Sequence, residues 1–285
     1  MSSVTRLTAA EVVAAVRELP ALPASITEVI RACDDQDMTV GQLSQVILRD
    51  QALTANILKL ANSAFYGHAR RVTTITEAVV LLGFSAVKSL AISSHTSRLL
   101  GGALPGYGLR PGELWTHSLA VAFTARRLAV EVHLAPVEEA FVAGLLHDVG
   151  KTILSTHMEH AFDEVTRIAE ERRLPFHEVE AELLGFDHAE LGARVAAAWS
   201  FPPELEEAIR HHHSPGLAQV KPALAHCVHL ADACCMMMGV GLGADGLAYG
   251  VDPGSLETLG IAPERLVRLM DEIQPLIATD PPAVA

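Results

Sequence analysis

Apolar residues recur along this chain at intervals of three and four positions, the spacing that gathers them on one face of an α-helix. Ile26, Val29, Ile30 and Cys33 follow this spacing near the N-terminus. A strand-like alternation of apolar and polar residues, bounded by turns, is nearly absent. The pattern therefore predicts an all-α fold without a central sheet.

Polar residues mark where these helices begin. Four segments have the Ser/Thr/Asp-x-x-Glu/Gln pattern of a capping box, and they start at Thr8, Thr39, Thr74 and Asp187. Gly83 is expected to end the helix that starts near Thr74, and Ser85 to cap the next one.

The clearest internal boundary is the tract GGALPGYGLRPGE at residues 101–113, whose glycines and prolines are typical of a linker or a long loop. About six short helices are expected before it. A glycine-rich stretch, 239–254, interrupts the pattern again before the last helix. The helices expected after the tract are 111–132, 136–147, 160–173, 175–184, 188–199, 203–213, 222–238 and 263–277.

The composition agrees with a helical, globular protein. The chain has 285 residues, of which 50% are apolar and 5% aromatic, enough for one large or two small domains. Alanine, leucine and valine dominate, which favours helices over a β-sandwich or barrel. No apolar run reaches the roughly 18 residues of a membrane span, and the N-terminus has no secretory pattern. We therefore expect a cytoplasmic protein with no membrane partner.

The charge balance argues against nucleic acid as a partner. Lys and Arg number 21 against 34 Asp and Glu, which gives a net charge of −13. Proteins that bind nucleic acid generally present a basic field to the phosphates. The pair Arg70–Arg71 is interpreted as part of a solvated face, so a DNA-binding regulator is the weakest of the functions considered.

Histidine is the residue type that carries candidate chemistry. None of the four cysteines stands in a C-x-x-C pair, so a zinc ribbon or a thioredoxin-like centre is not indicated. His147 and Asp148 close an apolar helix, in Leu-Leu-His-Asp-Val-Gly-Lys, where both side chains can enter one cavity. Imidazole together with carboxylate suits Zn, Mn, Fe or Ni rather than Mg alone.

Further candidates follow in order along the chain. His117 lies on an earlier helix, His188 opens a later one, and His211, His212 and His213 close another. Asp232 lies within a helix, where a buried carboxylate without a partner is costly and a metal would offset the cost. The alternatives are a solvated helix end for the three histidines, and a neighbouring donor or an exposed position for Asp232. The remaining histidines are interpreted as surface or packing residues, namely His68, His95, His133, His157, His160, His177, His226 and His229.

This ordered set resembles the HD phosphohydrolase superfamily, in which such residues hold one or two metals that activate water for phosphoester hydrolysis. The spacing is similar to that of the HD-GYP branch, which cleaves cyclic dinucleotides. Ser-Pro-Gly-Leu follows the His212-His213 pair, however, where that branch has Gly-Tyr-Pro. The departure argues against cyclic-dinucleotide hydrolysis. The resemblance implies the metal ligands His117, His147, Asp148, His188, His212, His213 and Asp232.

The N-terminal half resembles the HDOD family, whose members are HD-related output modules of bacterial signalling. The most specific piece is Asn62-Ser-Ala-Phe-Tyr-Gly67, interpreted as a helix C-cap with inward aromatics rather than a ligand contact. The resemblance covers about residues 12–240 and implies an N-terminal helical subdomain at 1–108, an HD-like metal-site subdomain at 109–240 and a helical extension at 241–285. The other matching segments are Leu19–Pro23, Ile47–Leu53, Leu60–Gly67, Ala78–Gly83 and Ala208–Pro215.

The resemblance implies a bacterial regulatory or scaffolding protein. Many HDOD domains lack part of the metal set, whereas this chain keeps every HD position. The expected cofactor is one or two divalent transition ions (Fe, Mn, Zn or Ni), and the expected partner is a signalling protein or a small phosphorylated ligand. The alternative is a metal-dependent phosphohydrolase acting on a nucleotide or cyclic (di)nucleotide. In that case Asp148 and Lys151 would be catalytic, with Lys151 binding the substrate phosphate as a point charge.

Overall fold

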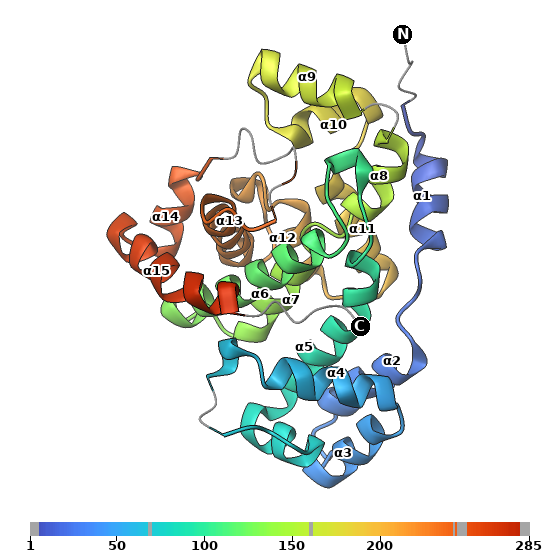
Figure 1. The fold of residues 1–285 in the computed structure, drawn as a ribbon, viewed down its shortest axis with the longest axis vertical. Coiled ribbons are helices and arrows are strands. Elements are labelled where there is room, and N and C mark those ends of the chain that lie inside the picture. The colour runs from blue at the N-terminus through green and yellow to red at the C-terminus, as the bar shows by residue number, and fades with distance from the viewer. Residues whose placement is uncertain (1–5, 68–69, 160–161, 242, 244–249, 280–285) are drawn as a thin grey trace. The chain divides into compact units, whose positions relative to one another are not determined.

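The protein is helical throughout the part that the structure, a computed structural model, describes (Figure 1). The described residues are 6–67, 70–159, 162–241, 243 and 250–279. Within these ranges there is no strand, only an isolated antiparallel bridge between Leu104 and Leu109. The predicted all-α fold is confirmed.

Two compact units make up the chain, and they differ from the three predicted segments. Unit 1 comprises residues 1–20 and 100–273, and unit 2 comprises residues 21–99 and 274–285. The N-terminal helix joins unit 1 because the backbone amide of Leu7 donates to the carbonyl of Leu184 at 2.8 Å. The C-terminal helix joins the same unit as far as residue 273, and there Arg265 pairs with Glu131 at 2.8 Å.

Unit 2 is built from short helices with small apolar faces. Leu43, Ile47 and Ile57 are fully buried and form its core. Ser25 donates to the Asp50 carboxylate at 2.8 Å, so the residue that caps α4 also holds α2. The elements of this unit are α2 (Ala24–Asp34), α3 (Val40–Leu48), α4 (Gln51–Ala61), η1 (Ala64–Tyr66) and most of α5 (Ile75–Leu100).

Helix α5 is two helices joined at Gly83, as the sequence predicted. Gly83 has φ 82° and ψ 168°, which only glycine adopts without strain. By length and composition α5 is the one helix of the described residues that would qualify as a membrane span, although no such segment was expected. Half of the residues in its apolar window are buried, and core helices of globular proteins meet the same criterion.

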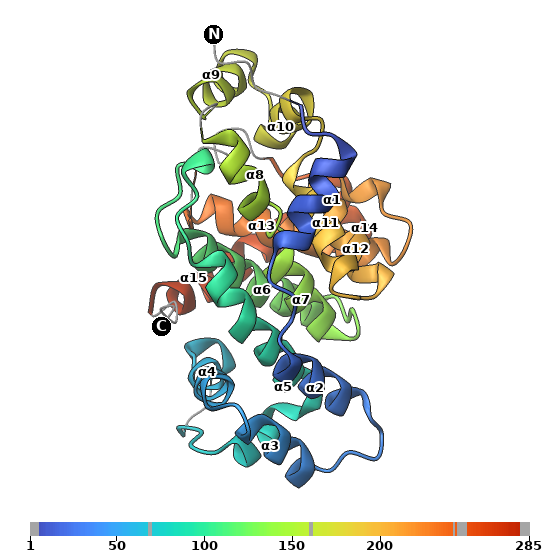
Figure 2. The same cartoon turned by 90° about the vertical axis from the view of Figure 1, so that its right-hand side faces the viewer.

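Unit 1 is built around helix α13, which is apolar on nearly every side. Figure 1 shows α6, α12 and α14 around it, in agreement with their contacts, and Figure 2 shows α1 beside α11. The helices are α1 (Ala9–Glu18), α6 (Glu113–Glu131), α7 (Val137–Leu146), α8 (Lys151–Met158), α9 (Phe162–Arg172), α10 (Phe176–Leu184), α11 (His188–Ala198), α12 (Pro203–Arg210), α13 (Pro222–Met237), α14 (Pro253–Leu259) and most of α15 (Pro263–Thr279), with the short 3-10 helices η2 (Pro105–Tyr107) and η3 (Pro215–Leu217).

The helix boundaries agree with the sequence except at two short helices. Thr8 and Thr39 form the capping boxes that were predicted. Helices α8 and α14 were not predicted, since each is too short to show a clear apolar period. Helix α14 lies within the stretch that its glycines marked as irregular, and Asp252 caps it.

The glycine- and proline-rich tract is an ordered loop of unit 1 rather than a linker. Leu104 and Leu109 exchange backbone hydrogen bonds of 2.9 and 3.1 Å, which closes the loop. Tyr107 at its tip is fully buried. A Cβ atom on Gly106 would lie 2.6 Å from the carbonyl oxygen of Ser155, so the glycine lets this loop pack directly on α8. The tract therefore belongs to the core that supports the candidate site.

Candidate metal centre

The seven predicted ligands converge in unit 1. They come from α6, α11 and α13 and from the chain just after α7 and α12. Three overlapping groups have donor atoms within 4.8 Å of one another, and these groups are His188, His212 and His213; His117, His147 and Asp148; and His147, His212 and Asp232.

Asp148 lies at the centre, with each carboxylate oxygen facing a different pair of histidines. Its Oδ2 is 3.3 Å from Nε2 of His147 and 3.7 Å from Nε2 of His117. Its Oδ1 is 3.3 Å from Nε2 of His188 and 3.9 Å from Nε2 of His212. One carboxylate thus joins two sets of donors.

The two remaining ligands complete these sets. Asp232 Oδ1 lies 3.0 Å from Nε2 of His117 and 3.6 Å from Nε2 of His147, on the Oδ2 side of Asp148. His213 Nε2 lies 2.8 Å from Nε2 of His188, on the Oδ1 side. Each set then has four nitrogen or oxygen donors, the number that a tetrahedral transition-metal site needs.

Glycines allow the helix ends to meet at this point. A Cβ atom on Gly150 would lie 2.0 Å from the carbonyl oxygen of His188, and one on Gly192 would lie 2.9 Å from a side-chain carbon of Ile209. The chain after His147 therefore touches the first turn of α11 through its bare backbone. Any larger residue would push His188 away from Asp148.

A hydrogen bond at Nδ1 orients each of the four histidines whose Nε2 faces Asp148. The acceptors for His117, His147 and His212 are the backbone carbonyls of Val240, Gly144 and Ile209, at 2.9, 2.8 and 2.7 Å. A carbonyl can only accept, so the hydrogen of a neutral ring stands on Nδ1. The lone pair on Nε2 is then directed to the centre, as in metal-binding histidines.

For His188 the orienting acceptor is the buried carboxylate of Glu180, which was not predicted. Its Oε2 is 2.8 Å from Nδ1 of His188 and also accepts from the His188 amide at 2.8 Å. Tyr107 donates to Oε1 at 2.8 Å. The available signal was that Glu180 falls on the apolar face of α10, one turn after Phe176. Carboxylate–histidine pairs of this kind fix a ligand and raise its basicity.

Burial makes this cluster costly without a bound cation. Six of the seven predicted ligands are at most 3% exposed. Within the described residues, three inward atoms have no hydrogen-bond partner, namely Nε2 of His147, Oδ1 of Asp148 and Nε2 of His212. Each such buried polar atom costs about 1–3 kcal/mol. A divalent cation would satisfy all three, so the donor set fits a transition metal.

The charges of the cluster are set by its own members. Burial disfavours the ionised forms of Asp148 and Asp232, but the neighbouring histidines outweigh it and hold the pKa of both carboxyls well below the usual range. Burial also opposes a charged His147, yet these carboxylates raise its pKa to about 10. Burial, followed by the charge of His147, lowers the pKa of His212.

Lys151, which would bind a substrate phosphate if the protein were a hydrolase, is held inside the cluster. Its Nζ donates to Asp148 Oδ2 at 2.7 Å, and the side chain is almost fully buried. The ammonium lies 5.5 Å from the centre of the Tyr107 ring. Its charge therefore compensates Asp148.

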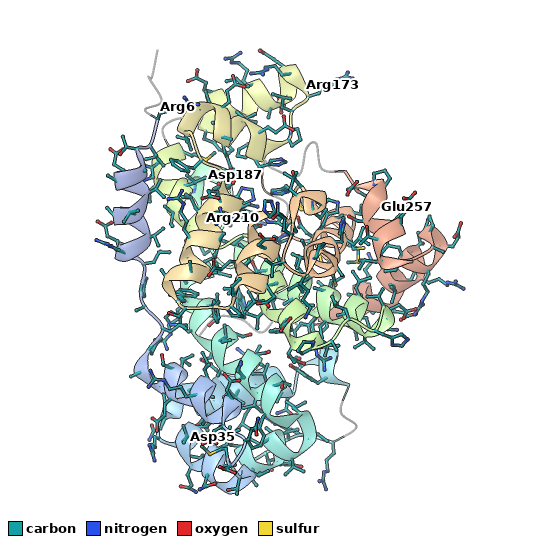
Figure 3. All side chains as sticks on the ribbon, turned by 180° about the vertical axis from the view of Figure 1, so that it is seen from behind. Arg6, Asp35, Arg173, Asp187, Arg210 and Glu257 are labelled. Atoms are coloured by element: carbon teal, nitrogen blue, oxygen red, sulfur yellow. The ribbon has the colours of Figure 1, made fainter. Side chains whose placement is uncertain are left out.

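The partly exposed side of the cluster is formed by His213 and by His177, a residue that had been interpreted as surface or packing. The two rings stack with centroids 4.1 Å apart and an angle of 5°. Asp187, which caps α11, and Arg210, which ends α12, lie close to each other in Figure 3. His229 supports the opposite side, since its Nδ1 donates to the His212 carbonyl at 2.7 Å.

Comparison with known proteins agrees with this geometry. A family model described as the HDOD domain matches residues 19–215, more than half of the chain. The protein is a member of the HDOD domain family. The match covers all the predicted ligands of this HDOD protein except Asp232, which lies beyond it in α13.

Solved structures with similar folds come from several bacteria. An HDOD domain protein of unknown function from Geobacter sulfurreducens is 25% identical, with a TM-score of 0.75, and the match covers 95% of this chain and 99% of that one. A protein from Marinobacter aquaeolei VT8, provisionally named a signal transduction protein, is 26% identical with a TM-score of 0.72, over 92% and 58% of the two chains. A protein from Shewanella amazonensis SB2B, provisionally named a phosphohydrolase, is 26% identical with a TM-score of 0.64, over 93% and 97%.

A curated relative is an uncharacterized protein of Treponema pallidum (strain Nichols). It is 28% identical to this HDOD protein over 207 residues, which are 72% of this chain and 40% of the relative. The chain thus spans less than half the length of that relative.

Proposed function

We propose that this HDOD protein is a bacterial signalling protein in which unit 1 binds one or two divalent transition ions and serves a regulatory or scaffolding role. The observation that supports it most is that three buried atoms, Oδ1 of Asp148 and Nε2 of His147 and His212, have no hydrogen-bond partner among the described residues. A bound cation accounts for them. The partner would be a signalling protein or a small phosphorylated ligand in the cytoplasm. The net charge of −13 disfavours nucleic acid.

The closed character of the centre favours regulation over catalysis. A phosphoester substrate has to reach the ion, yet six of the seven proposed ligands are essentially buried. Lys151 already neutralises Asp148 at 2.7 Å and is 5% exposed. A structural ion that links helices α6, α7, α11, α12 and α13 would stabilise one arrangement of unit 1 for a partner to recognise.

One observation favours a second candidate, a metal-dependent phosphohydrolase acting on a nucleotide or cyclic (di)nucleotide. Asp148 faces two four-donor sets, one on each oxygen, and a shared carboxylate is the usual bridge in two-metal hydrolases. Two such ions would lower the pKa of a bound water and withdraw charge from a phosphoryl oxygen. His213, the partly exposed ligand, marks the side on which a substrate would approach.

Metal analysis and an activity screen separate the two candidates. The untagged protein should contain one or two equivalents of a transition ion, and Asp148→Ala should lose them and melt at a lower temperature. Asp163→Ala, an exposed position on α9, is the matched control and should behave like the wild type. Turnover of a panel of nucleotides and cyclic dinucleotides that Asp148→Ala abolishes would identify an enzyme. Full metal content without turnover would support the regulatory role, and absence of metal would contradict both.

A further inference from the structure

Unit 2 contains a cavity of its own, with a volume of about 820 Å³. Four lining residues on α4, Ala55, Leu58, Lys59 and Asn62, have the spacing i, i+3, i+4 and i+7 that defines one helix face. The segment Arg71–Thr73 forms the other wall. This volume lies within the range of small-molecule binding sites, roughly 300–1,000 Å³. A helix face and an extended segment therefore border an open cavity large enough for a metabolite.

Asn62 holds the two walls together. Its side-chain amide donates to the carbonyl of Leu58 at 2.7 Å and to that of Val72 at 2.8 Å. Its side-chain oxygen accepts from the Val72 amide at 2.8 Å, and the Val72 side chain is buried. The polar atoms of Asn62 are thus engaged with the backbone, as the C-cap interpretation of this motif expects. The residue shapes the cavity instead of binding a ligand.

The charge of the lining is opposite to that of the chain. Among the described residues seven line the cavity, Lys59 and Arg71 are two of them and none of the seven is acidic, in a protein whose net charge is −13. A cavity lined by one sign of charge attracts a ligand of the other sign. The lining also includes Ala55, Leu58 and Val72, which offer apolar surface beside the cations.

The two neighbouring arginines have different roles. Arg70 pairs with Glu77 at 3.2 Å, and the same carboxylate accepts from the Thr73 amide at 3.0 Å. Glu77 is therefore engaged, and Arg71 makes no ion pair with any carboxylate of the described residues. The charge of Arg71 is left for a ligand, whereas that of Arg70 is compensated.

We propose that this cavity binds a small phosphorylated organic ligand of the nucleotide class. Lys59 and Arg71 contact its phosphate oxygens, since a guanidinium and an ammonium are the side chains suited to phosphate. Leu58, Ala55 and Val72 contact its less polar part. The inference rests on the proposed regulatory function, because the nucleotide would be the ligand to which the regulatory protein responds. It needs no ion in unit 1.

Titration calorimetry of the full chain with four probes tests the proposal. The probes are ATP, GTP, inorganic pyrophosphate and sulfate, in about 0.15 M salt and with a chelator present. The chelator removes any contribution from a metal at the unit 1 centre. At least one nucleotide should bind saturably and more tightly than pyrophosphate. Lys59→Ala and Arg71→Ala should each weaken that binding about tenfold or more, the loss expected for a charge-assisted hydrogen bond.

Arg70→Ala is the matched control, since it removes the same charge from the neighbouring position outside the lining. It should change nucleotide binding less than twofold. An equal loss in Arg70→Ala would show non-specific surface attraction and overturn the proposal. So would equal binding of all four probes, which indicates an adventitious anion only, or no binding at millimolar concentration. A protein that binds no metal but passes these tests would refute the metal centre alone.

Discussion

The Nε2 atoms of His188 and His213 lie 2.8 Å apart. Two unprotonated ring nitrogens both present lone pairs and repel each other at this distance. A hydrogen atom on one of them, or a cation bound by both, must therefore lie between them. Nδ1 of His188 also lies 2.8 Å from the Glu180 carboxylate, and this carboxylate outweighs burial and raises the pKa of His188. A metal bound by His188 and His213 therefore has to displace the proton between their Nε2 atoms.

Metal binding should release protons and strengthen as the pH rises. The pKa of His147 is raised to about 10 in the polypeptide, so near pH 7 this ring is charged and must lose its proton to become a ligand. The proton count follows from calorimetric titration of zinc in buffers with different ionisation enthalpies. About one proton or more should be released per ion near pH 7, with fewer as the pH approaches 10. An affinity independent of pH between 7 and 9 would contradict this assignment.

The raised pKa of His147 also predicts that the stability of the metal-free protein falls as the pH rises, whereas metal binding strengthens. Protonated His147 stabilises the fold below its unfolded pKa of roughly 6.5, and this contribution is lost as the pH rises through about 10. Chemical denaturation in the presence of a chelator should therefore show lower stability at pH 10 than at pH 7. Metal-loaded protein should show a smaller decrease, since the ion takes the place of the proton.

Glu180→Gln should weaken metal binding by about 10- to 100-fold, the usual effect of removing a carboxylate behind a ligating histidine. The substitution removes the charge that orients Nδ1 of His188 but keeps the side-chain volume. Glu182→Gln is the matched control on the same helix, because Glu182 is half exposed and its one ion-pair partner among the described residues is Arg172. Competition against a colorimetric zinc chelator gives both affinities. Similar affinities for the two variants would show that Glu180 has only a packing role.

Asp148 was predicted from the sequence and Glu180 was not, and the difference shows which parts of the site the sequence reveals. The predicted ligands at 147, 148, 188, 212 and 213 lie at the starts or just past the ends of helices, where capping and apolar spacing already fix the direction of the chain. Their convergence could be expected from order and residue type. The acceptors behind them are mostly backbone carbonyls, which every residue has. No pattern in the sequence marks which carbonyl will face an imidazole.

The loop at 101–113 shows a different limit of prediction. Gly and Pro indicate an irregular backbone, and that much was correct. They do not tell whether the segment is exposed or packed. Tyr107 decides this, because its ring is buried and its hydroxyl donates to Glu180. That contact spans 73 positions of the sequence, so only the tertiary structure reveals it.

Lys151→Met should have opposite effects on the metal-free and the metal-bound protein. The Lys151 ammonium is buried and lies 2.7 Å from Asp148, and removing one partner of a buried ion pair costs about 3–5 kcal/mol. The metal-free protein should therefore melt at a lower temperature. A divalent cation no longer competes with the ammonium for Asp148, so metal binding should strengthen. Scanning calorimetry with and without zinc should show a larger metal-induced shift than in the wild type.

Lys88→Met is the control for the loss of a lysine charge. Lys88 pairs with Asp34 where both side chains are substantially exposed. The stability of the Lys88→Met variant should therefore differ from that of the wild type by less than about 1 kcal/mol. A variant Lys151→Met that keeps wild-type stability and metal affinity but loses turnover of a phosphoester would support the original phosphate-binding interpretation of this lysine.

Gly150→Ala should disrupt the candidate centre without touching a ligand. Gly150 has φ −64° and ψ −23°, which alanine adopts freely, so the backbone conformation does not oppose the change. The obstacle is space, since the new Cβ would lie 2.0 Å from the His188 carbonyl oxygen and 2.7 Å from the Gly192 amide nitrogen. Both are backbone atoms and cannot rotate away. Helix α11 has to move, and His188 moves with it.

Such overpacking lowers the stability of the fold by about 1–3 kcal/mol. Metal affinity should also fall, because His188 and His213 would no longer face the same metal position as Asp148. The control is Gly41→Ala in α3, where a Cβ atom meets nothing within 4 Å. There the substitution should raise stability by roughly 0.5–1 kcal/mol, through the helix propensity of alanine. Denaturation and metal content measured on both variants check the pair. If Gly150→Ala kept full metal content and stability, the close contact between the His147–Asp148 helix end and α11 would not be what positions the ligands.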